Sequence, residues 1–222
     1  MYKFSKRLLD LIVSLIALII LFPVFIPIMF LLRLTGEGEV FYFQERIGIN
    51  NSFFHIWKFA TMLKNSIDMG TGTITLQNDF RVTTVGKFLR KTKINELPQI
   101  INILKGDISL VGPRPLVSKT FKSYSDKVQS KIYNVKPGLT GIGSIIFRDE
   151  ESIISAVKDE DPHEFYRRVI APYKGELEMW YQRKRSFFLD LQIIFLTAWV
   201  ILFPKSRLYE KLFKDLPVGN FS

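Results

Sequence analysis

One long apolar run dominates the first part of the chain. Residues 8–32 are apolar except at Asp10, Ser14, Pro23 and Pro27. A helix needs about 20 apolar residues to cross a bilayer, so this run is long enough. It is also longer than the apolar region of a signal peptide, which has about 7–15 residues, and no small-residue cleavage site follows it. The pattern therefore predicts a helix held in a membrane.

The flanks of this run bear on how the helix enters the membrane. Lys6 and Arg7 precede the apolar core, and Arg33 with the basic remainder of the chain follows it. Positive residues favour the cytoplasmic side, so both ends favour the same side. Pro23, in the apolar middle, removes a backbone donor and kinks a helix. A re-entrant helix satisfies both observations, and a simple membrane-crossing helix is the alternative.

After Gly36 the chain alternates short apolar segments with charged ones. We expect a re-entrant membrane anchor over residues 1–35, a globular domain over 36–185, and an interfacial helix with a basic tail over 186–222. This alternation of short strand-like segments and longer helical segments predicts an α+β fold in which helices predominate. The expected elements are short strands at 40–43 and 52–59 around the loop QERIGINN, and helices at 85–93, 97–105, 118–133, 150–181 and 187–203.

Composition narrows the candidate chemistry. Lys and Arg number 31 against 21 Asp and Glu, which gives a net charge of +10. Such an excess suits nucleic acid, an anionic membrane surface or phosphate-bearing substrates. The absence of cysteine excludes disulfides and zinc–thiolate sites. The chain's two histidines, His55 and His163, lie far apart in sequence, which argues against a histidine-rich metal cluster.

Basic residues are concentrated between Asp79 and Pro115, with Glu96 among them. Arginine can grip two phosphate oxygens, and a carboxylate can hold a metal or attack phosphorus. The plainer interpretation is a solvated basic face. RNA binding would require exposed aromatics among the basic residues, and Phe88 is the only aromatic residue between Arg81 and Arg114.

Five motifs occur in a recognisable order: KRLLD from Lys6, QERIG from Gln44, KFATM from Lys58, a long segment ending in ELPQIINILKGDISLVGPRP at Pro115, and VKPGLTG from Val135. Together they resemble the bacterial sugar transferase family, the monotopic phosphoglycosyl transferases. The resemblance extends from about residue 6 to residue 203.

The resemblance implies a re-entrant helix in the cytoplasmic leaflet of the bacterial inner membrane, with a small globular domain and amphipathic helices on its cytoplasmic face. It implies an aspartate that attacks the sugar-side phosphorus of a UDP-sugar with Mg²⁺ present. UMP then leaves, and polyprenyl (undecaprenyl) phosphate accepts the phosphosugar, which initiates a bacterial surface glycan. The expected partners are these two substrates and the lipid bilayer, without nucleic acid, and a homodimer is left open.

The resemblance also assigns roles to particular residues. The membrane anchor is expected to involve Lys6, Arg7, Asp10 and Pro23. The substrate phosphates are assigned to Arg114, Arg81 and Lys58. The catalytic candidates are Asn95, Glu96 and Glu178, of which Asn95 and Glu96 are also the candidate ligands of Mg²⁺.

The chain departs from the family pattern at its centre. Asn95 occupies the position where the family has the attacking Asp, and an amide cannot attack phosphorus as a carboxylate does, although its carbonyl oxygen can bind a metal weakly. Ala60, Ser144 and Glu178 replace the usual Arg, Gln and Asp. Because these changes occur together, a single engineered substitution is disfavoured. We expect an active enzyme that uses Glu96, Glu178 or no covalent intermediate, and the alternative is a catalytically impaired homologue with a binding or scaffolding role.

Overall fold

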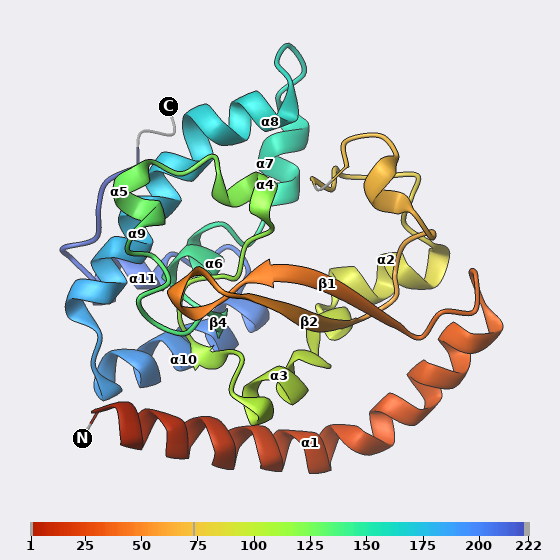
Figure 1. Cartoon of the computed structure of the whole chain (residues 1–222), viewed down its shortest axis with the longest axis horizontal. Coiled ribbons are helices and arrows are strands. Elements are labelled where there is room, and N and C mark those ends of the chain that lie inside the picture. The colour runs from red at the N-terminus through yellow and green to blue at the C-terminus, as the bar shows by residue number, and fades with distance from the viewer. Residues whose placement is uncertain (1, 73, 220–222) are drawn as a thin grey trace.

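The computed structural model describes residues 2–72 and 74–219, and most of them lie in helices (Figure 1). Two small two-stranded sheets accompany the helices. The α+β class with predominant helices is therefore confirmed. The elements in chain order are α1 (Tyr2–Leu34), β1 (Phe41–Ile47), η1 (Ile49–Asn51), β2 (Phe53–Phe59), η2 (Ser66–Asp68), α2 (Thr84–Lys91), η3 (Ile94–Glu96), α3 (Gln99–Lys105), β3 (Ser109–Val111), α4 (Ser118–Phe121), α5 (Asp126–Gln129), β4 (Gly138–Thr140), α6 (Ile142–Ile146), α7 (Glu150–Ala156), α8 (Pro162–Phe165), η4 (Tyr166–Ile170), α9 (Ala171–Lys184), α10 (Phe187–Leu202) and α11 (Leu208–Leu212).

Helix α1 lies lengthwise against the rest of the molecule. Figure 1 shows it running beneath the other elements and turning upward in its C-terminal part, where Pro23 and Pro27 occur within the helix. One stripe of α1 faces the protein, and its members recur every three or four residues, the spacing of a single helix face: Asp10, Ser14, Leu18, Leu21, Phe25, Ile28 and Leu32. It is also the described helix that is long and apolar enough to cross a membrane.

Polar residues near the N-terminal end of α1 attach this helix to two other elements, α3 and β3. Arg7 donates to the carbonyls of Ile103 and Leu104 at 2.6 and 2.8 Å, near the C-terminal end of α3, where carbonyls outnumber the helix's own donors. The Asp10 carboxylate accepts from Ser109 Oγ at 3.0 Å and from the backbone N–H of Leu110 at 2.9 Å. These side chains of the KRLLD motif therefore contact protein rather than solvent.

Strands β1 and β2 form an antiparallel hairpin with two chemically different faces. Side chains alternate across a strand, and the register pairs Phe41 with Phe59 but Tyr42 with Lys58. The aromatic face packs on α1, with the ring centroids of Phe25 and Phe59 5.3 Å apart. The opposite face carries Lys58 and Arg46. The expectation of a loop at QERIG is wrong, since the strand continues to Ile47.

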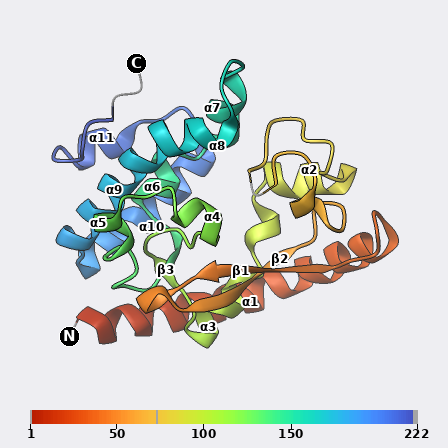
Figure 2. The ribbon, with the colours of Figure 1, turned by 45° about the horizontal axis from the view of Figure 1, so that its top comes forward.

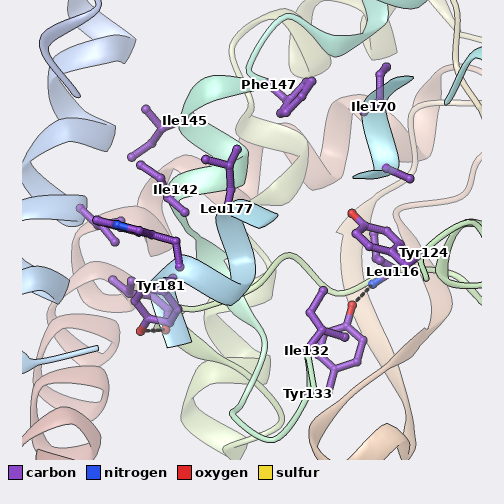
Figure 3. Packing of buried hydrophobic residues seen from close by; sticks show 14 of the residues in the cluster. Leu116, Tyr124, Ile132, Tyr133, Ile142, Ile145, Phe147, Ile170, Leu177 and Tyr181 are labelled. Atoms are coloured by element: carbon purple, nitrogen blue, oxygen red, sulfur yellow. Dashed lines mark hydrogen bonds between the residues drawn. The ribbon is translucent and has the colours of Figure 1, made fainter. Parts of the chain in front are cut away.

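The second sheet, formed by β3 and β4, lies within the main hydrophobic core. Strands β3 and β4 pair in parallel, Ser109 with Gly138 and Val111 with Thr140. A Cβ atom at Gly138 would lie 2.1 Å from the backbone nitrogen of Gly112, so only glycine permits this approach. Around the sheet lies the main core, part of which is drawn in Figure 3, where Tyr133 points its hydroxyl at the backbone of Leu116.

Helix α10 matches the expected helix over residues 187–203 to within one residue. It buries Leu189, Ile193 and Leu196 in the main core. Its other side is apolar and exposed, as at Phe188 and Phe195. Figures 1 and 2 both place α10 beside the N-terminal end of α1.

The segments 118–133 and 150–181, expected to be helical throughout, are divided into shorter helices. Asp161 explains one of the breaks. Its carboxylate accepts from the backbone N–H groups of His163 and Glu164, so it caps a new helix, and Pro162 occupies the first turn of that helix. Helical charge patterning alone did not locate this break.

Candidate active site

The candidate site is built around the carboxylate of Glu96, at the end of the short helix η3. The preceding turn is sharp, because Lys93 adopts a left-handed conformation with φ of +60°. Arg114 donates from both terminal nitrogens to Glu96, with Nη2 2.7 Å from Oε1 and Nη1 3.4 Å from Oε2. Lys58 Nζ lies 3.5 Å from the same Oε1. The side chain of Glu96 is 16% exposed, so the group is sheltered but open to a ligand.

The two cations come from separate elements that the fold fixes in place. Lys58 stands on β2, whereas Arg114 lies in the turn that follows β3. Tyr133 holds this turn, since its hydroxyl accepts from the N–H of Leu116 at 2.9 Å and donates to the carbonyl of Arg114 at 2.8 Å. The structure thus brings together three of the residues named from sequence: Glu96, Arg114 and Lys58.

Sequence reasoning missed Arg46, which adds a third cation to this group. Its Nη1 donates to the carbonyl of Pro115 at 2.9 Å and its Nη2 to Oε1 of Gln44 at 2.5 Å. Its Nε is buried and has no partner among the described residues. The signal available in the sequence was the QERIG motif, which carries one arginine in a segment interpreted as a loop.

The electrostatics of the group follow from burial and crowding. Burial alone would raise the pKa of Glu96, but the charges of Arg114 and Lys58 outweigh burial and hold this pKa well below its usual range. Burial lowers the pKa of Lys58 to about 7, partly offset by Glu96. Burial, and then the charge of Arg114, lower the pKa of Arg46 to about 10. Glu96 is therefore an ionised carboxylate in a site with excess positive charge.

Asn95 is 5% exposed, and its Oδ1 finds no hydrogen-bond partner among the described residues. A buried carbonyl oxygen without a partner is costly unless a ligand satisfies it. Within residues 2–72 and 74–219 no three His, Cys, Asp or Glu side chains form a group that could hold a metal. Asn95 and Glu96 offer only oxygen ligands, and Mg²⁺ takes few of these from a protein and completes its shell with water and phosphate. The residues present fit that ion.

Glu178, the other candidate catalytic carboxylate, forms no ion pair with the Glu96 group among the described residues. It is 3% exposed on α9 and accepts from the backbone N–H of Arg114. Burial raises the pKa of Glu178 to about 8, with Lys174 acting in the opposite direction. Its Oε2 has no hydrogen-bond partner in the described part of the chain. At neutral pH this group is mainly a neutral acid beneath the Arg114 turn, which suits support of that turn better than attack on phosphorus.

Arg81 differs most from its sequence-based expectation of binding a substrate phosphate. Its side chain is 1% exposed and forms an ion pair with Asp79. The remaining N–H groups donate to acceptors of the preceding loop, at 2.7 to 3.1 Å: the carbonyls of Ser66, Met69, Gly72 and Ile74 and the hydroxyl of Thr71. Arg81 therefore organises the segment that contributes these acceptors, and every nitrogen of its guanidinium is already engaged.

Comparison with known proteins places this geometry in context. The model of a family described as bacterial sugar transferase matches residues 1–204. The undecaprenyl-phosphate galactose phosphotransferase of Salmonella typhimurium is 33% identical over 90% of this chain, and the UDP-glucose:undecaprenyl-phosphate glucose-1-phosphate transferase of Klebsiella pneumoniae is 37% identical over 87%. The chain spans 41% and 39% of these two relatives. The exopolysaccharide production protein ExoY of Rhizobium meliloti is 33% identical, with 87% of this chain and 83% of that protein aligned.

Proposed function

We propose that this chain, which belongs to the bacterial sugar transferase family, transfers a phosphosugar from a UDP-sugar to polyprenyl phosphate. Three of the compared relatives are named for transfer of a sugar phosphate to undecaprenyl phosphate or for exopolysaccharide production. In this proposal the reaction begins a bacterial surface glycan. It takes place at the cytoplasmic face of the inner membrane, where the acceptor lipid presents its phosphate.

The observation that carries the proposal is the position of Glu96 between Arg114 and Lys58. The two cations keep the carboxylate ionised, and the site retains positive charge after Glu96 is counted. Such a site favours an incoming diphosphate and stabilises the charge that develops on the departing phosphate oxygen. A bidentate arginine also orients the group it binds, which a lysine does not.

Glu96 serves the reaction by one of two routes. In the first, an oxygen of Glu96 attacks the sugar-side phosphorus and the bond to the phosphate of UMP breaks, so UMP leaves with the bonding electrons. An oxygen of polyprenyl phosphate then attacks the same phosphorus and releases Glu96. In the second, Glu96 only holds the charged groups in place, while an oxygen of polyprenyl phosphate attacks the sugar-side phosphorus directly and the bond to the phosphate of UMP breaks, so UMP leaves with the bonding electrons. Asn95 cannot attack in either route because its amide nitrogen lone pair is delocalised.

The proposed cofactor is Mg²⁺, with Glu96 and the unpartnered Oδ1 of Asn95 as its protein ligands. When bound, the ion neutralises charge on the diphosphate and on the departing UMP. Arg114, Lys58 and the ion would then share the phosphate oxygens. Sharing the phosphate oxygens in this way suits a chain that has one carboxylate, Glu96, at the pair of positions where the family pattern has two.

The outer surfaces of α1 and α10 support membrane attachment without a full crossing. Along α1 the side chains facing away from the protein are apolar and exposed, among them Ile16, Ile20 and Phe30, and α10 continues this surface with Phe188 and Phe195. Because one stripe of α1 is covered by the domain along most of its length, α1 cannot be surrounded by lipid. We therefore propose that α1 enters and leaves the same leaflet, bent at its two prolines.

The deciding experiment uses the full-length chain purified in nanodiscs with polyprenyl phosphate and MgCl₂. Each of a panel of UDP-sugars is supplied, and the release of UMP and the formation of a lipid-linked phosphosugar are both measured. We expect one UDP-sugar to give both products in equal amounts. Absence of UMP release with every UDP-sugar, from protein that shows a cooperative thermal transition, would refute the proposed activity.

A further inference from the structure

Arg46 has a donor that the protein itself does not use. Two of its three nitrogens are engaged, Nη1 by the carbonyl of Pro115 and Nη2 by the side chain of Gln44. These two bonds fix the plane of the guanidinium. The remaining Nε is buried without a partner in the described part of the chain. A buried N–H left without an acceptor costs free energy that a suitable ligand would recover.

The position of Arg46 in the sheet explains which site this donor serves. Lys58 is paired across the hairpin with Tyr42, and Tyr42 is four residues before Arg46 on β1. Because side chains alternate between the two faces of a strand, Arg46 and Lys58 lie on the same face of the β1–β2 hairpin. The carbonyl that Arg46 contacts belongs to Pro115, the residue after Arg114. Arg46 is thus held beside both cations that contact Glu96.

The charge balance of the group supports a ligand with more than one negative charge. Arg46 and Arg114 are positively charged beside the single carboxylate of Glu96, and their charges repel each other. Lys58, with a pKa of about 7, adds part of a further positive charge at neutral pH. Like charges held together in a sheltered site are unfavourable unless an anion compensates them. One carboxylate compensates one of them. A diphosphate offers at least two further charges and several acceptor oxygens.

We propose that Arg46 binds the diphosphate of the donor substrate through its Nε, as a third phosphate-binding residue beside Arg114 and Lys58. The inference rests on the proposed function, because it takes a nucleoside diphosphate-sugar as the donor. Gln44 and the Pro115 carbonyl then act as the supports that aim this donor, and the QERIG segment becomes part of the substrate site.

The test measures binding of UDP, with MgCl₂ present, to the full-length chain in nanodiscs by titration calorimetry. Arg46→Gln removes the charge and the N–H, and Arg46→Lys keeps the charge but cannot supply the fixed fork. Arg207→Gln is the matched control, since Arg207 is exposed and its one ion pair among the described residues is with Glu210. We expect both Arg46 variants to bind UDP roughly 10- to 100-fold more weakly, the loss typical of one hydrogen bond to a charged group, and the control to be unchanged.

Thermal transitions measured in parallel identify a variant that fails to fold. If Arg46→Gln does not fold, binding by Arg46→Lys, which keeps the positive charge, decides the question. UDP binding within twofold of the wild type in the folded Arg46 variants would overturn the role of Arg46 alone. Absence of UDP binding by the folded wild-type chain would overturn the proposed donor, and this inference with it. The two failures are therefore distinguishable.

Discussion

Lys6 and Asp190 are 184 residues apart in the sequence, yet the Nζ of Lys6 lies 2.8 Å from Oδ2 of Asp190. Asp190 is 1% exposed on α10, and its Oδ1 accepts from the hydroxyl of Tyr181 at 2.7 Å. Lys6 also donates to the carbonyl of Val111 at 2.8 Å. The Lys6 side chain therefore joins the first turns of α1 to α10 by an ion pair and to the second sheet by a hydrogen bond.

We predict that Lys6→Met destabilises the chain by roughly 3–5 kcal/mol, because it leaves the Asp190 carboxylate buried without its cation. Denaturant unfolding in detergent, followed by tryptophan fluorescence, measures this change. Lys3→Met is the control, since Lys3 is exposed one turn away. If Lys6→Met and Lys3→Met unfold at the same denaturant concentration, the ion pair contributes nothing to attachment of α1.

Arg114→Lys keeps a positive charge near Glu96 but cannot make both contacts to the carboxylate. We predict a loss of UMP release of roughly 30- to 100-fold, corresponding to about 2–3 kcal/mol of interaction in the transition state. The thermal transition should stay within a few degrees of the wild type, because Tyr133 binds the backbone carbonyl of Arg114 and not its side chain. Near-normal turnover would remove Arg114 from the substrate site.

Glu96→Gln is predicted to abolish UMP release in the nanodisc assay. The substitution removes the ionised carboxylate on which both routes depend and leaves Arg114 and Lys58 without their anion. Rapid quench followed by mass spectrometry of the wild-type chain separates the two routes, because a covalent phosphosugar on Glu96 appears only in the first. Measurable turnover by Glu96→Gln would exclude both.

Asn95→Asp is predicted to lower activity at neutral pH by roughly tenfold. The new carboxylate would be buried beside Glu96, so one of the two would have a raised pKa and the pair would repel the substrate phosphates. UMP release at pH 7 and at pH 8.5 measures the effect. A rise in activity, or a phosphosugar adduct trapped on residue 95, would instead indicate an enzyme impaired by the loss of its attacking Asp.

Glu178 gives a prediction about pH. The folded chain keeps a proton on this carboxyl up to a pKa of about 8, whereas the unfolded chain releases it near 4.5. Its contribution to stability is therefore full below about pH 4.5 and is lost as the pH rises through 8. Glu178→Gln should abolish this dependence, on the order of 4 kcal/mol across the window, and retain activity. Denaturant midpoints from pH 5 to 9, with the exposed Glu176→Gln as control, test both points.

The absence of cysteine makes topology easy to measure. We predict that single cysteines at Lys3 and at Val218, both exposed, resist an impermeant thiol reagent in intact cells and react after the membrane is broken. Replacing Pro23 and Pro27 by Leu should expose the Lys3 position, because the bend that returns the helix would be lost. Labelling of Lys3→Cys in intact cells, with Pro23 and Pro27 present, would establish a crossing helix.

The parts of the fold that were predicted from sequence are those with a strong local signal. The apolar runs at residues 8–32 and 187–203 each became one helix, α1 and α10. The strand conformation of the QERIG segment, and with it the position of Arg46, was not predicted. Charged residues in a strand give the same sequence pattern as a loop, and only the pairing with β2 reveals the strand. The sequence Asp161-Pro162 is a typical start of a helix, but the helical charge pattern on both sides of it led to the prediction of one continuous helix.

The grouping of the candidate site residues was predicted in part, and again only where the sequence carries a strong local signal. Glu96, Arg114 and Lys58 lie in short motifs that marked them as candidates, and the fold brings the three side chains together. Arg81 lies in an equally convincing motif, yet its partners are mostly backbone carbonyls of a loop that has no periodic pattern. No sequence rule identifies such acceptors. Glu178 illustrates a second limit, since burial and not residue type sets its protonation.

The lengthwise packing of α1 has a kinetic consequence for the proposed reaction. In the proposed topology, with α1 in one leaflet, the acceptor lipid reaches Glu96 by lateral diffusion, and its encounter with the enzyme is a search in two dimensions. The relevant quantity is then the surface density of polyprenyl phosphate, and diluting the bilayer with other lipids should slow turnover at constant bulk concentration. The UDP-sugar arrives from water in three dimensions, so its saturation should not change with that dilution.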